Sequence, residues 1–277
     1  MTDSAPLIRI TDPADARIAE FTAIRERDLA GRGDRFIAEG RVVLNALLDT
    51  PAHDRFILEK LFVLENRLEG LQPVLARLPA DVPVYTAERS VMDAAAGFAM
   101  HRGILALGRH RPAASLGSFL GNMPAQALLV VGIGLSNHDN MGAIFRNAGV
   151  FGADGLLIDS TSCAPLYRKA IRVSVGAALR VPFWRGGDAS LLMRALVEHN
   201  FVPVGLSPHA GQDISRLRPA ARTALVLGSE GAGLPGDLLA GVLNVRIAQA
   251  PGMDSLNVAT ASGIALWQVA QAMNRLS

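Results

Sequence analysis

The chain has few cysteines, few aromatic residues and no long apolar run, and each shortage excludes a class of protein. Cys163 is the only cysteine among 277 residues, which rules out an intrachain disulfide and a cysteine-based zinc site. Aromatic residues make up 5% of the chain, which argues against large base-stacking platforms. The longest apolar stretch, around residues 127–135, is far shorter than the ~20 residues of a membrane span. Because the N-terminus also lacks a signal-peptide pattern, we expect a soluble, cytoplasmic protein with no membrane association.

Lysine is almost absent from the chain. Only Lys60 and Lys169 are lysine, so the other 25 of the 27 basic residues are arginine, and the net charge is +2. Two explanations of this bias are open. One is a GC-rich genome, and the other is that the planar guanidinium of arginine suits bidentate contacts to phosphate. Between residues 160 and 187 the chain carries five basic residues and no acidic one, which fits either a solvated face or a polyanion-binding surface. These five are Arg168, Lys169, Arg172, Arg180 and Arg185.

The pattern of apolar runs predicts two α/β domains. Half of the residues are hydrophobic, enough for a sizeable core. We expect domains at residues 1–110 and 125–277, with a linker at 111–124. In the first domain, periodicity predicts helices over 11–29 and around 43–48, and strands at 61–64, 82–85 and 104–107. In the second, strands at 127–133, 155–158, 201–206, 223–227 and 243–247 alternate with helices at 140–150, 188–200 and 255–275. This alternation predicts a parallel sheet covered on both faces.

Several familiar catalytic motifs fail on inspection. Gly132 and Gly134 begin a dinucleotide fingerprint, but Asn137 stands where its third glycine belongs. No phosphate-binding P-loop occurs, and Ser229 lacks the first glycine of a nucleophile elbow. The six histidines show no metal-ligand spacing, so we expect no bound metal. Hydride transfer, nucleotide hydrolysis, serine hydrolysis and zinc chemistry are therefore disfavoured.

Three glycine- and asparagine-rich patches in the second half each follow a predicted strand. The first covers residues 140–148, where we expect Asn140 to cap a helix. Gly142, Arg146 and Gly149 would share one face of that helix. Glycine in a helix costs ~1 kcal/mol relative to alanine, so two of them beside an arginine suggest the close approach of a phosphate or a partner backbone. Tight helix packing with Arg146 in a salt bridge is the alternative.

The second and third patches also have the composition of a ligand crevice. The second, residues 228–234, has three glycines whose N–H groups suit a small polar ligand. Its one charge, Glu230, would pair with an arginine or hold a cationic ligand. In the third, Pro251-Gly252 forces a turn, Asp254 or Ser255 would cap the last helix, and Asn257 would lie in its first turn. Helix capping explains one of these three polar residues. The presence of the other two favours a ligand-binding site.

Together, the three patches resemble the SpoU (TrmH-like) family of RNA 2′-O-ribose methyltransferases, within the SPOUT superfamily. The family's N-x-G-A-x-x-R motif is matched by residues 140–146, its G-S-E-G-x-G-L motif by residues 228–234, and its S-L-N-V motif by residues 255–258. The resemblance covers about residues 125–275. A weaker resemblance links residues 36–40 and 103–106 to the family's small substrate-binding domain. Ile247-Ala248-Gln249 departs from the family's usual I-P-M.

The resemblance implies a fold, a cofactor and partners. The fold would be an α/β SPOUT domain with a parallel sheet and a trefoil knot, preceded by a small L30e-like α/β domain that binds the RNA substrate. The methyl donor would be S-adenosylmethionine, the substrate ribosomal or transfer RNA, and the assembly a homodimer with its sites near the dimer interface. Sequence rules alone would disfavour a knot, because knotted folds are rare.

The resemblance also assigns roles to individual residues. Arg146 is the family's candidate for activating the ribose hydroxyl, but a guanidinium with a pKa above ~12 is a poor base, so we expect it to clamp the neighbouring phosphate. Two alternatives stay open: a catalytically silent RNA-binding relative, and a methyltransferase acting on a base. The expected catalytic residues are Asn140, Arg146, Glu230, Ser255 and Asn257. The expected cofactor-binding residues are Leu206, Gly228, Gly231, Ile247, Ala248 and Leu256.

Overall fold

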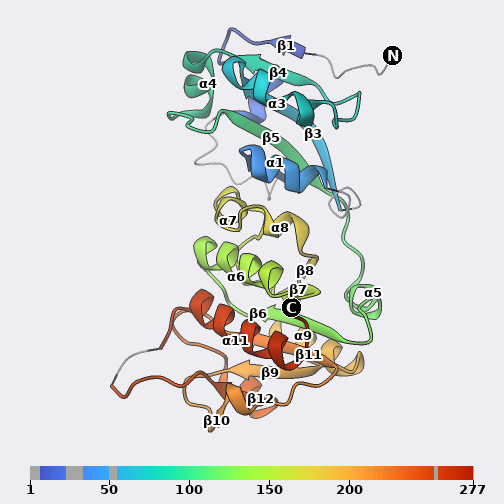
Figure 1. Ribbon diagram of the computed structural model, residues 1–277, viewed down its shortest axis with the longest axis vertical. Coiled ribbons are helices and arrows are strands. Elements are labelled where there is room, and N and C mark those ends of the chain that lie inside the picture. Colours follow the sequence, from blue (N-terminus) through green and yellow to red (C-terminus); the bar gives the residue numbers. More distant parts are fainter. Residues whose placement is uncertain (1–6, 23–33, 50–54, 253–254, 277) are drawn as a thin grey trace. The chain divides into compact units, whose positions relative to one another are not determined.

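The computed structural model divides into two compact units, which are described separately. It describes residues 7–22, 34–49, 55–252 and 255–276. The first unit comprises Met1–Ala113 together with Leu166–Arg180, and the second comprises Ala114–Pro165 and Val181–Ser277 (Figure 1). We predicted a single boundary between the domains, at residues 111–124. The structure differs because Leu166–Arg180, from the second half of the chain, belongs to the first unit.

The described residues of the first unit form a five-stranded mixed sheet. Its order is β1-β4-β3-β5-β2, in which β1, β4 and β3 run parallel and β5 is antiparallel to both β3 and β2. The strands are β1 (Leu7–Arg9), β2 (Arg35–Glu39), β3 (Phe56–Leu64), β4 (Val84–Ala87) and β5 (Ile104–His110). The three strands predicted from apolar runs lie in or overlap β3, β4 and β5, and neither edge strand, β1 or β2, was predicted.

Short helices cover this sheet. They are the 3-10 helices η1 (Ala16–Phe21) and η2 (Glu65–Arg67), and the α-helices α1 (Arg41–Leu48), α3 (Leu68–Leu75) and α4 (Arg89–Ala96). In α1, Val43, Leu44 and Leu47 are buried, as their helical spacing predicted. The helix predicted over 11–29 is, within the described residues, only the 3-10 helix η1, and residues 23–29 lie outside them. Its Ile18 and Phe21 are buried in a cluster with Met92 of α4.

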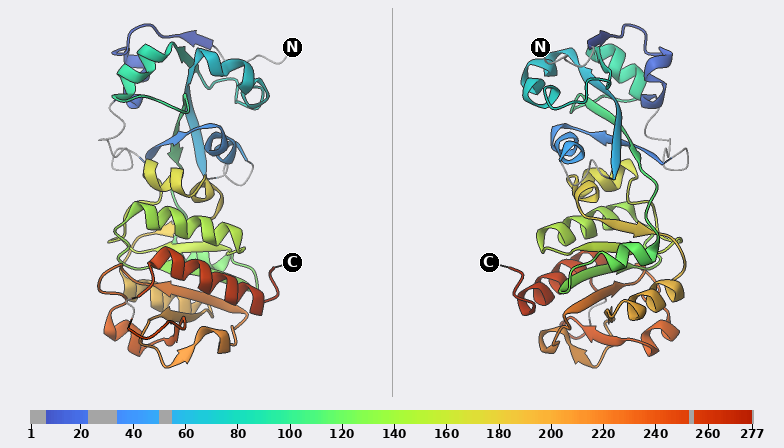
Figure 2. Two further views of the ribbon diagram at one scale, coloured as in Figure 1. Left: turned by 60° about the vertical axis from the view of Figure 1, so that its left-hand side comes forward. Right: turned by 90° about the vertical axis from the view of Figure 1, so that its right-hand side faces the viewer.

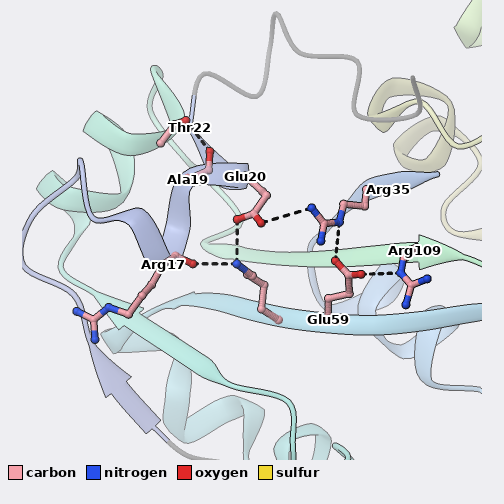
Figure 3. A network of polar contacts seen from close by, with 8 residues as sticks. Arg17, Ala19, Glu20, Thr22, Arg35, Glu59 and Arg109 are labelled. Atoms are coloured by element: carbon pink, nitrogen blue, oxygen red, sulfur yellow. Dashed lines mark hydrogen bonds and ion pairs between the residues drawn. The ribbon is translucent and has the colours of Figure 1, made fainter. Parts of the chain in front are cut away.

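Ion pairs connect β2, β3, β5 and η1 at the surface of the first sheet (Figure 3). Arg109 donates a hydrogen bond to Glu59 at 2.7 Å, and Arg35 lies 2.8 Å from the other oxygen of the same carboxylate as an ion pair. Lys60 lies 2.9 Å from Glu20. The register of β3 against β5 shifts between Leu58 and Lys60, so Glu59 is the extra residue of a bulge. A bulge re-aims one side chain. Here the re-aimed carboxylate bridges two neighbouring strands.

The helices α7 (Arg168–Val173) and α8 (Ala177–Arg180) complete the first unit, and ion pairs anchor them. Arg168 Nη1 lies 2.7 Å from Glu39 Oε2, and Arg180 Nη2 lies 2.7 Å from Asp49 Oδ2. The acidic partners that the sequence lacks between residues 160 and 187 are therefore supplied by β2 and the end of α1. Arg168 and Glu39 are both mostly buried, so this pair holds α7 on the sheet.

The second unit contains a seven-stranded sheet in which every strand pair is parallel, which confirms the predicted α/β fold with a parallel sheet. The order is β10-β12-β9-β11-β6-β7-β8. The strands are β6 (Ala127–Gly132), β7 (Gly155–Ile158), β8 (Phe183–Arg185), β9 (Val202–Leu206), β10 (Gln212–Asp213), β11 (Arg222–Leu227) and β12 (Leu243–Arg246). β6 and β7 are buried along their whole length because helices cover both faces.

Helices form a layer on each face of this sheet. The pair α6 (His138–Val150) and α11 (Val258–Ala272) packs together on one face, and α5 (Leu116–Gly121) and α9 (Ala189–Glu198) lie on the other (Figure 2). Alternate residues of β6, such as Leu129 and Val131, join Leu120 of α5 and Leu196 of α9 in one core cluster. A short helix, α10 (Gly236–Ala240), and a 3-10 helix, η3 (Ile214–Arg216), complete the unit.

Two helix starts differ from the sequence-based prediction. Asn137, not Asn140, is the N-cap of α6, and its side chain accepts from the N–H of Asp139. Asn257, not Asp254 or Ser255, caps α11, accepting from Ala259 and Thr260; Asp254 lies outside the described residues. Each shift releases a polar side chain for another role. The segment predicted as a linker, residues 111–124, contains α5, which begins after its cap Ser115.

Within the described residues, no helix is both long enough and apolar enough to cross a lipid bilayer. The trefoil knot stays a prediction.

Candidate functional site

A cavity of about 760 Å³ lies at the carboxyl ends of β9, β11 and β12 in the second unit. The carboxyl ends of neighbouring parallel strands meet at one edge of a sheet, which is where α/β proteins bind ligands. Three loops therefore converge here, one after each strand, together with the start of α11. The cavity is lined by all six residues expected to bind the cofactor: Leu206, Gly228, Gly231, Ile247, Ala248 and Leu256.

The loop after β11 is folded tightly on itself. Ser229 and Gly233 form an isolated antiparallel bridge, each N–H donating to the other's carbonyl at 3.2 Å. A Cβ on Gly228 would lie 2.2 Å from the backbone carbon of Gly233, so only glycine fits there. Gly233 has a φ of +70°, a conformation that favours glycine. The loop's own geometry thus requires glycine at positions 228 and 233. A Cβ added to Gly231 would meet nothing within 4 Å, so the loop does not require glycine there.

A chain of hydrogen bonds connects the three sequence patches. Asn257 Nδ2 donates to Asn140 Oδ1 at 3.0 Å, and Asn140 Nδ2 donates to Glu230 Oε1 at 2.9 Å. Asn140 is buried, whereas Glu230 and Asn257 are exposed and line the cavity. The side-chain amide of Asn140 therefore has a fixed orientation, because its oxygen accepts one hydrogen bond and its nitrogen donates the other. The structure thus brings together three of the five expected catalytic residues.

Glu230 is held as a carboxylate by the loop before α6. Its oxygens accept from the N–H groups of Ser136 and Asn137 as well as from Asn140. Partial burial acts to raise the pKa of Glu230, but the hydrogen bonds from Asn140, Ser136 and Asn137 outweigh it and lower this pKa below its ordinary value. Glu230 is therefore ionised at neutral pH and is a weak proton acceptor. No ion pair connects it to an arginine within the described residues.

A buried carboxylate that the sequence analysis did not select supports the same loop. Asp159 is 2% exposed and follows β7. Its Oδ1 accepts from the N–H groups of Gly134 and Ser162, and hydroxyls of Thr161 and Ser162 also donate to it. Ser162 Oγ in turn accepts from the N–H of Leu135 at 2.9 Å. The polar run at 159–162 directly after a predicted strand was the signal that could have found it.

The two remaining expected catalytic residues have different surroundings. Ser255 lines the cavity. Arg146 lies on the last part of α6, is exposed, and forms no hydrogen bond or ion pair to the part of the chain that the structure describes. The alternative prediction, a salt bridge from Arg146 to another side chain, is therefore wrong as far as the described residues are concerned. Its guanidinium is available to a ligand or to another chain.

Comparison with known proteins assigns the family. The model of the SpoU rRNA Methylase family matches residues 127–267, about half of the chain. The chain belongs to the SpoU rRNA methylase family. The match spans β6 to α11 and so contains all three patches of the site.

Relatives of this SpoU family member align over most of their length. A protein of Mycobacterium tuberculosis (strain ATCC 25618 / H37Rv), described as an uncharacterized tRNA/rRNA methyltransferase, is 35% identical over 268 residues, covering 94% of this chain and 90% of the relative. The 23S rRNA (guanosine-2′-O-)-methyltransferase RlmB of Escherichia coli (strain K12) is 30% identical over 236 residues, covering 81% and 93%. The AdoMet-bound rRNA methyltransferase of Sinorhizobium meliloti, 21% identical, has the same fold, with a TM-score of 0.82 over 98% of this chain and 99% of that one.

Proposed function

We propose that this SpoU family member transfers a methyl group from S-adenosylmethionine to the 2′-hydroxyl of a ribose in ribosomal or transfer RNA, in the cytoplasm. The observation that carries the proposal is the hydrogen-bonded chain Asn257–Asn140–Glu230 beside the cavity, built from the three motifs that define the resemblance. The 2′-hydroxyl is the group that distinguishes RNA from DNA. The relative named as a guanosine-2′-O-methyltransferase supports a ribose target.

The residues that line the cavity fit S-adenosylmethionine in size and in charge. The cavity of about 760 Å³ lies within the ~300–1,000 Å³ typical of small-molecule sites. We assign the backbone at Leu206, Gly228 and Ile247 to the adenosyl moiety, with Gly231, Ala248 and Leu256 completing the wall. When bound, S-adenosylmethionine supplies an electrophilic sulfonium methyl group. The carboxylate of Glu230, which lines the cavity, adds a negative charge that favours a cationic ligand.

The hydrogen-bonded chain would act by orientation. Methyl transfer requires the ribose oxygen to be held in line with the methyl group, and fixed positioning supplies a large share of the rate. Because Glu230 has a lowered pKa, we assign it to holding Asn140 and the loop before α6 rather than to removing a proton. Asn257 and Ser255 would hold the ribose or the cofactor.

Arg146 would bind the RNA phosphate next to the reacting ribose and steer its hydroxyl, with the proton passing to phosphate or water. Its exposed guanidinium has no partner among the described residues, and a guanidinium binds phosphate in a bidentate manner. Replacing Arg146 by Ala should abolish methyl transfer and leave affinity for S-adenosylmethionine nearly unchanged. Unchanged turnover in that variant would contradict the assignment.

The protein would act as a homodimer. The neighbouring helices α6 and α11 expose three large apolar side chains, Val150 at 65%, Ile264 at 39% and Trp267 at 47%. Exposed apolar side chains on two adjoining helices suit an interface with a second copy of the chain. Light scattering after gel filtration should give a dimer for the native chain and a monomer for Trp267→Arg. A native monomer would contradict the assembly.

Calorimetric titration with S-adenosylmethionine, followed by nucleoside analysis of RNA after reaction, tests the function. Binding that weakens in Leu256→Arg, together with a 2′-O-methylated nucleoside, supports the proposal. A methylated base would instead identify a base methyltransferase. Absence of cofactor binding by the folded protein, with and without RNA, would identify a catalytically silent RNA-binding relative.

A further inference from the structure

The loops after β6 and β7 are joined by a cluster of hydrogen bonds behind the cavity of the second unit. β6 and β7 pair in parallel, so the loops that follow them leave the sheet side by side (Figure 1). The loop after β6, residues 133–137, leads into α6, and the loop after β7 begins with residues 159–163. Neither of these segments lines the cavity, so each can affect a ligand there only through another residue.

Asp159 is the centre of this cluster. Its Oδ1 accepts from the N–H groups of Gly134 at 3.1 Å and Ser162 at 3.0 Å. The hydroxyl groups of Thr161 and Ser162 also donate to its carboxyl oxygens. Within the described part of the chain Asp159 forms no ion pair, although it is buried. Burying a carboxyl group is costly unless hydrogen bonds compensate, so this cluster is what allows Asp159 to lie here.

The loop after β7 holds several backbone groups of the loop before α6. The N–H of Gly134 donates to Asp159. The N–H of Leu135 donates to Ser162 Oγ at 2.9 Å, and the carbonyl of Leu135 accepts from the N–H of Cys163 at 2.7 Å. Three consecutive polar groups of one backbone are therefore fixed by the other loop.

Gly134 makes the course of the loop before α6 depend on these hydrogen bonds. Its φ of +66° lies in the left-handed region, which glycine adopts about as readily as negative φ values. The residue itself therefore does not select this conformation. The hydrogen bond from its N–H to Asp159 supplies the selection.

The next two residues of the same loop bind Glu230. The N–H groups of Ser136 and Asn137 donate to its carboxylate at 3.4 Å and 3.3 Å, and the Ser136 hydroxyl donates at 3.3 Å. These bonds are longer than the ~2.9–3.0 Å typical of N–H···O, so a small displacement of the loop would break them. Asn137 also caps α6, the helix that carries Asn140.

We propose that Asp159 is a positioning residue for methyl transfer, because it fixes the loop whose N–H groups hold the carboxylate of Glu230. The proposal rests on the proposed function, since it takes the hydrogen-bonded chain through Glu230 as the part of the site that orients the reactants. Asp159 touches neither cofactor nor RNA in this role. Its loss should therefore change the rate of the bound complex more than the binding of RNA.

Two replacements of Asp159 separate its position from its charge. In Asp159→Asn, the amide oxygen can take the place of Oδ1 and keep the bonds from Gly134 and Ser162. The Thr161 hydroxyl then accepts from the amide nitrogen, since a hydroxyl both donates and accepts. In Asp159→Ala all of these bonds are lost. Both variants lack the carboxylate, and only the alanine variant releases the loop.

The direct test is the pKa of Glu230, measured by carbon-13 NMR of the side-chain carboxyl group in the protein without cofactor or RNA. Partial burial acts to raise this pKa, and hydrogen bonds from Asn140, Ser136 and Asn137 outweigh it and lower the pKa. The resonance is assigned by its absence in Glu230→Gln.

The two Asp159 variants should differ in this pKa. In Asp159→Ala the pKa of Glu230 should rise toward the ordinary glutamate value of about 4.3, because the N–H groups of the loop move away. In Asp159→Asn it should stay low. Removal of a neighbouring negative charge alone would lower the pKa instead. An unchanged or lowered pKa of Glu230 in Asp159→Ala would overturn the proposal.

Ser162→Ala is a smaller change that covers the case in which Asp159→Ala does not fold. It removes the acceptor of the Leu135 N–H and one donor to Asp159, and it leaves the bond from Gly134 to Asp159 in place. The pKa of Glu230 should again rise, by less than in Asp159→Ala. If Asp159→Ala does not fold, an unchanged pKa in Ser162→Ala overturns the proposal.

Thr223→Val is the control for a general loss of stability. Thr223 is 0% exposed, and its hydroxyl donates to the carbonyl of Ala220 at 2.9 Å at the start of β11, the opposite end of that strand from the cavity. This variant also loses a buried hydrogen bond, so its melting temperature should fall. The pKa of Glu230 and kcat should both match the native protein.

Kinetics with RNA measure the consequence for catalysis. Asp159→Ala should lower kcat roughly 10–100-fold and leave the KM for RNA nearly unchanged, whereas Asp159→Asn should keep kcat within about threefold of native. When Asp159→Ala is combined with Glu230→Gln, the two losses in kcat should not add, because both act through the same hydrogen bonds. Additive losses would contradict a path through Glu230.

Failure of this proposal and failure of the proposed function give different results. The NMR titration contains neither cofactor nor RNA, so its outcome does not depend on methyl transfer. An unchanged pKa of Glu230 in Asp159→Ala, in a protein that methylates RNA, would overturn the positioning role and leave the function standing. The expected rise in pKa, in a protein that transfers no methyl group, would overturn the function and leave the control of Glu230 by Asp159 standing.

Discussion

The side-chain nitrogen of Asn257 donates a hydrogen bond of 3.0 Å to the side-chain oxygen of Asn140, which lies 117 residues earlier in the chain. The cap of α11 is thereby fixed to the first turn of α6. Because Asn140 in turn donates to Glu230, three loops share one network, and a change at any member alters the geometry of the other two.

Replacing Asn140 by Asp tests this network. The new carboxylate would face Glu230 where an amide donated before, and two carboxylates this close raise the pKa of one of them. We expect a loss of about 1–3 kcal/mol in the free energy of unfolding at neutral pH. A raised pKa in the folded state means that this loss should shrink as the pH falls toward about 5.

Thermal unfolding at several pH values measures this effect, with Asn122→Asp as the control. Asn122 is exposed and forms no side-chain hydrogen bond to the described residues. A destabilisation by Asn140→Asp that is independent of pH would contradict the carboxylate pair.

Replacing Glu230 by Gln should change how stability depends on pH. The pKa of Glu230 is lowered in the folded protein, so its contribution is complete above the ordinary glutamate pKa of about 4.3 and is lost as the pH falls through the lower, folded value. The native protein should therefore lose more stability than Glu230→Gln between pH about 6 and about 3. Glu198→Gln, at an exposed position on α9, is the control and should follow the native curve.

Replacing Gly228 by Ala should distort the loop after β11. The added methyl group would lie 2.2 Å from the backbone of Gly233, so the loop must shift, at a cost of about 1–3 kcal/mol. Affinity for S-adenosylmethionine should fall with it, because Gly228 lines the cavity. Gly236→Ala is the matched control, since its Cβ would meet open space. Calorimetry that finds the two alanine variants equal in affinity would argue against the cofactor assignment.

Cys163 should be nearly inert toward thiol reagents in the folded protein. Burial, and secondarily the negative charge of Glu230, raise the pKa of this thiol to about 11. Since the thiolate is the reactive species, modification at pH about 8 should be at least roughly tenfold slower in the folded than in the unfolded protein. Ellman's reagent measures this directly because the chain has no other cysteine. Equal rates in the two states would contradict the burial.

Much of the second unit could be predicted from the sequence for a definite physical reason. Strands buried on both faces are continuously apolar, and the predicted strand at 155–158 coincides with β7. Once the sheet is parallel, the ends of its strands meet at one edge. Leu206, Gly228 and Ile247 therefore line one cavity although they are distant in the sequence.

Helix starts were harder to predict because several polar residues compete for each cap. Asn137 and Asn140 are both good caps, as are Asp254, Ser255 and Asn257. Which of them caps depends on what else each side chain can bond. Asn140 has partners from two other loops, so the cap falls to Asn137.

The sequence by itself determined the parallel sheet, the three loops at its edge and the family, because periodicity and short motifs are local properties. Only the tertiary structure decided which charges are compensated. Glu39 pairs with Arg168 and Asp49 with Arg180 across 129 and 131 residues, and no local pattern encodes such a pairing. The same packing leaves Arg172 of α7 exposed, with no ion pair inside the part of the chain that the structure describes. Electrostatic interactions depend on distance in space, which the chain acquires only when it folds.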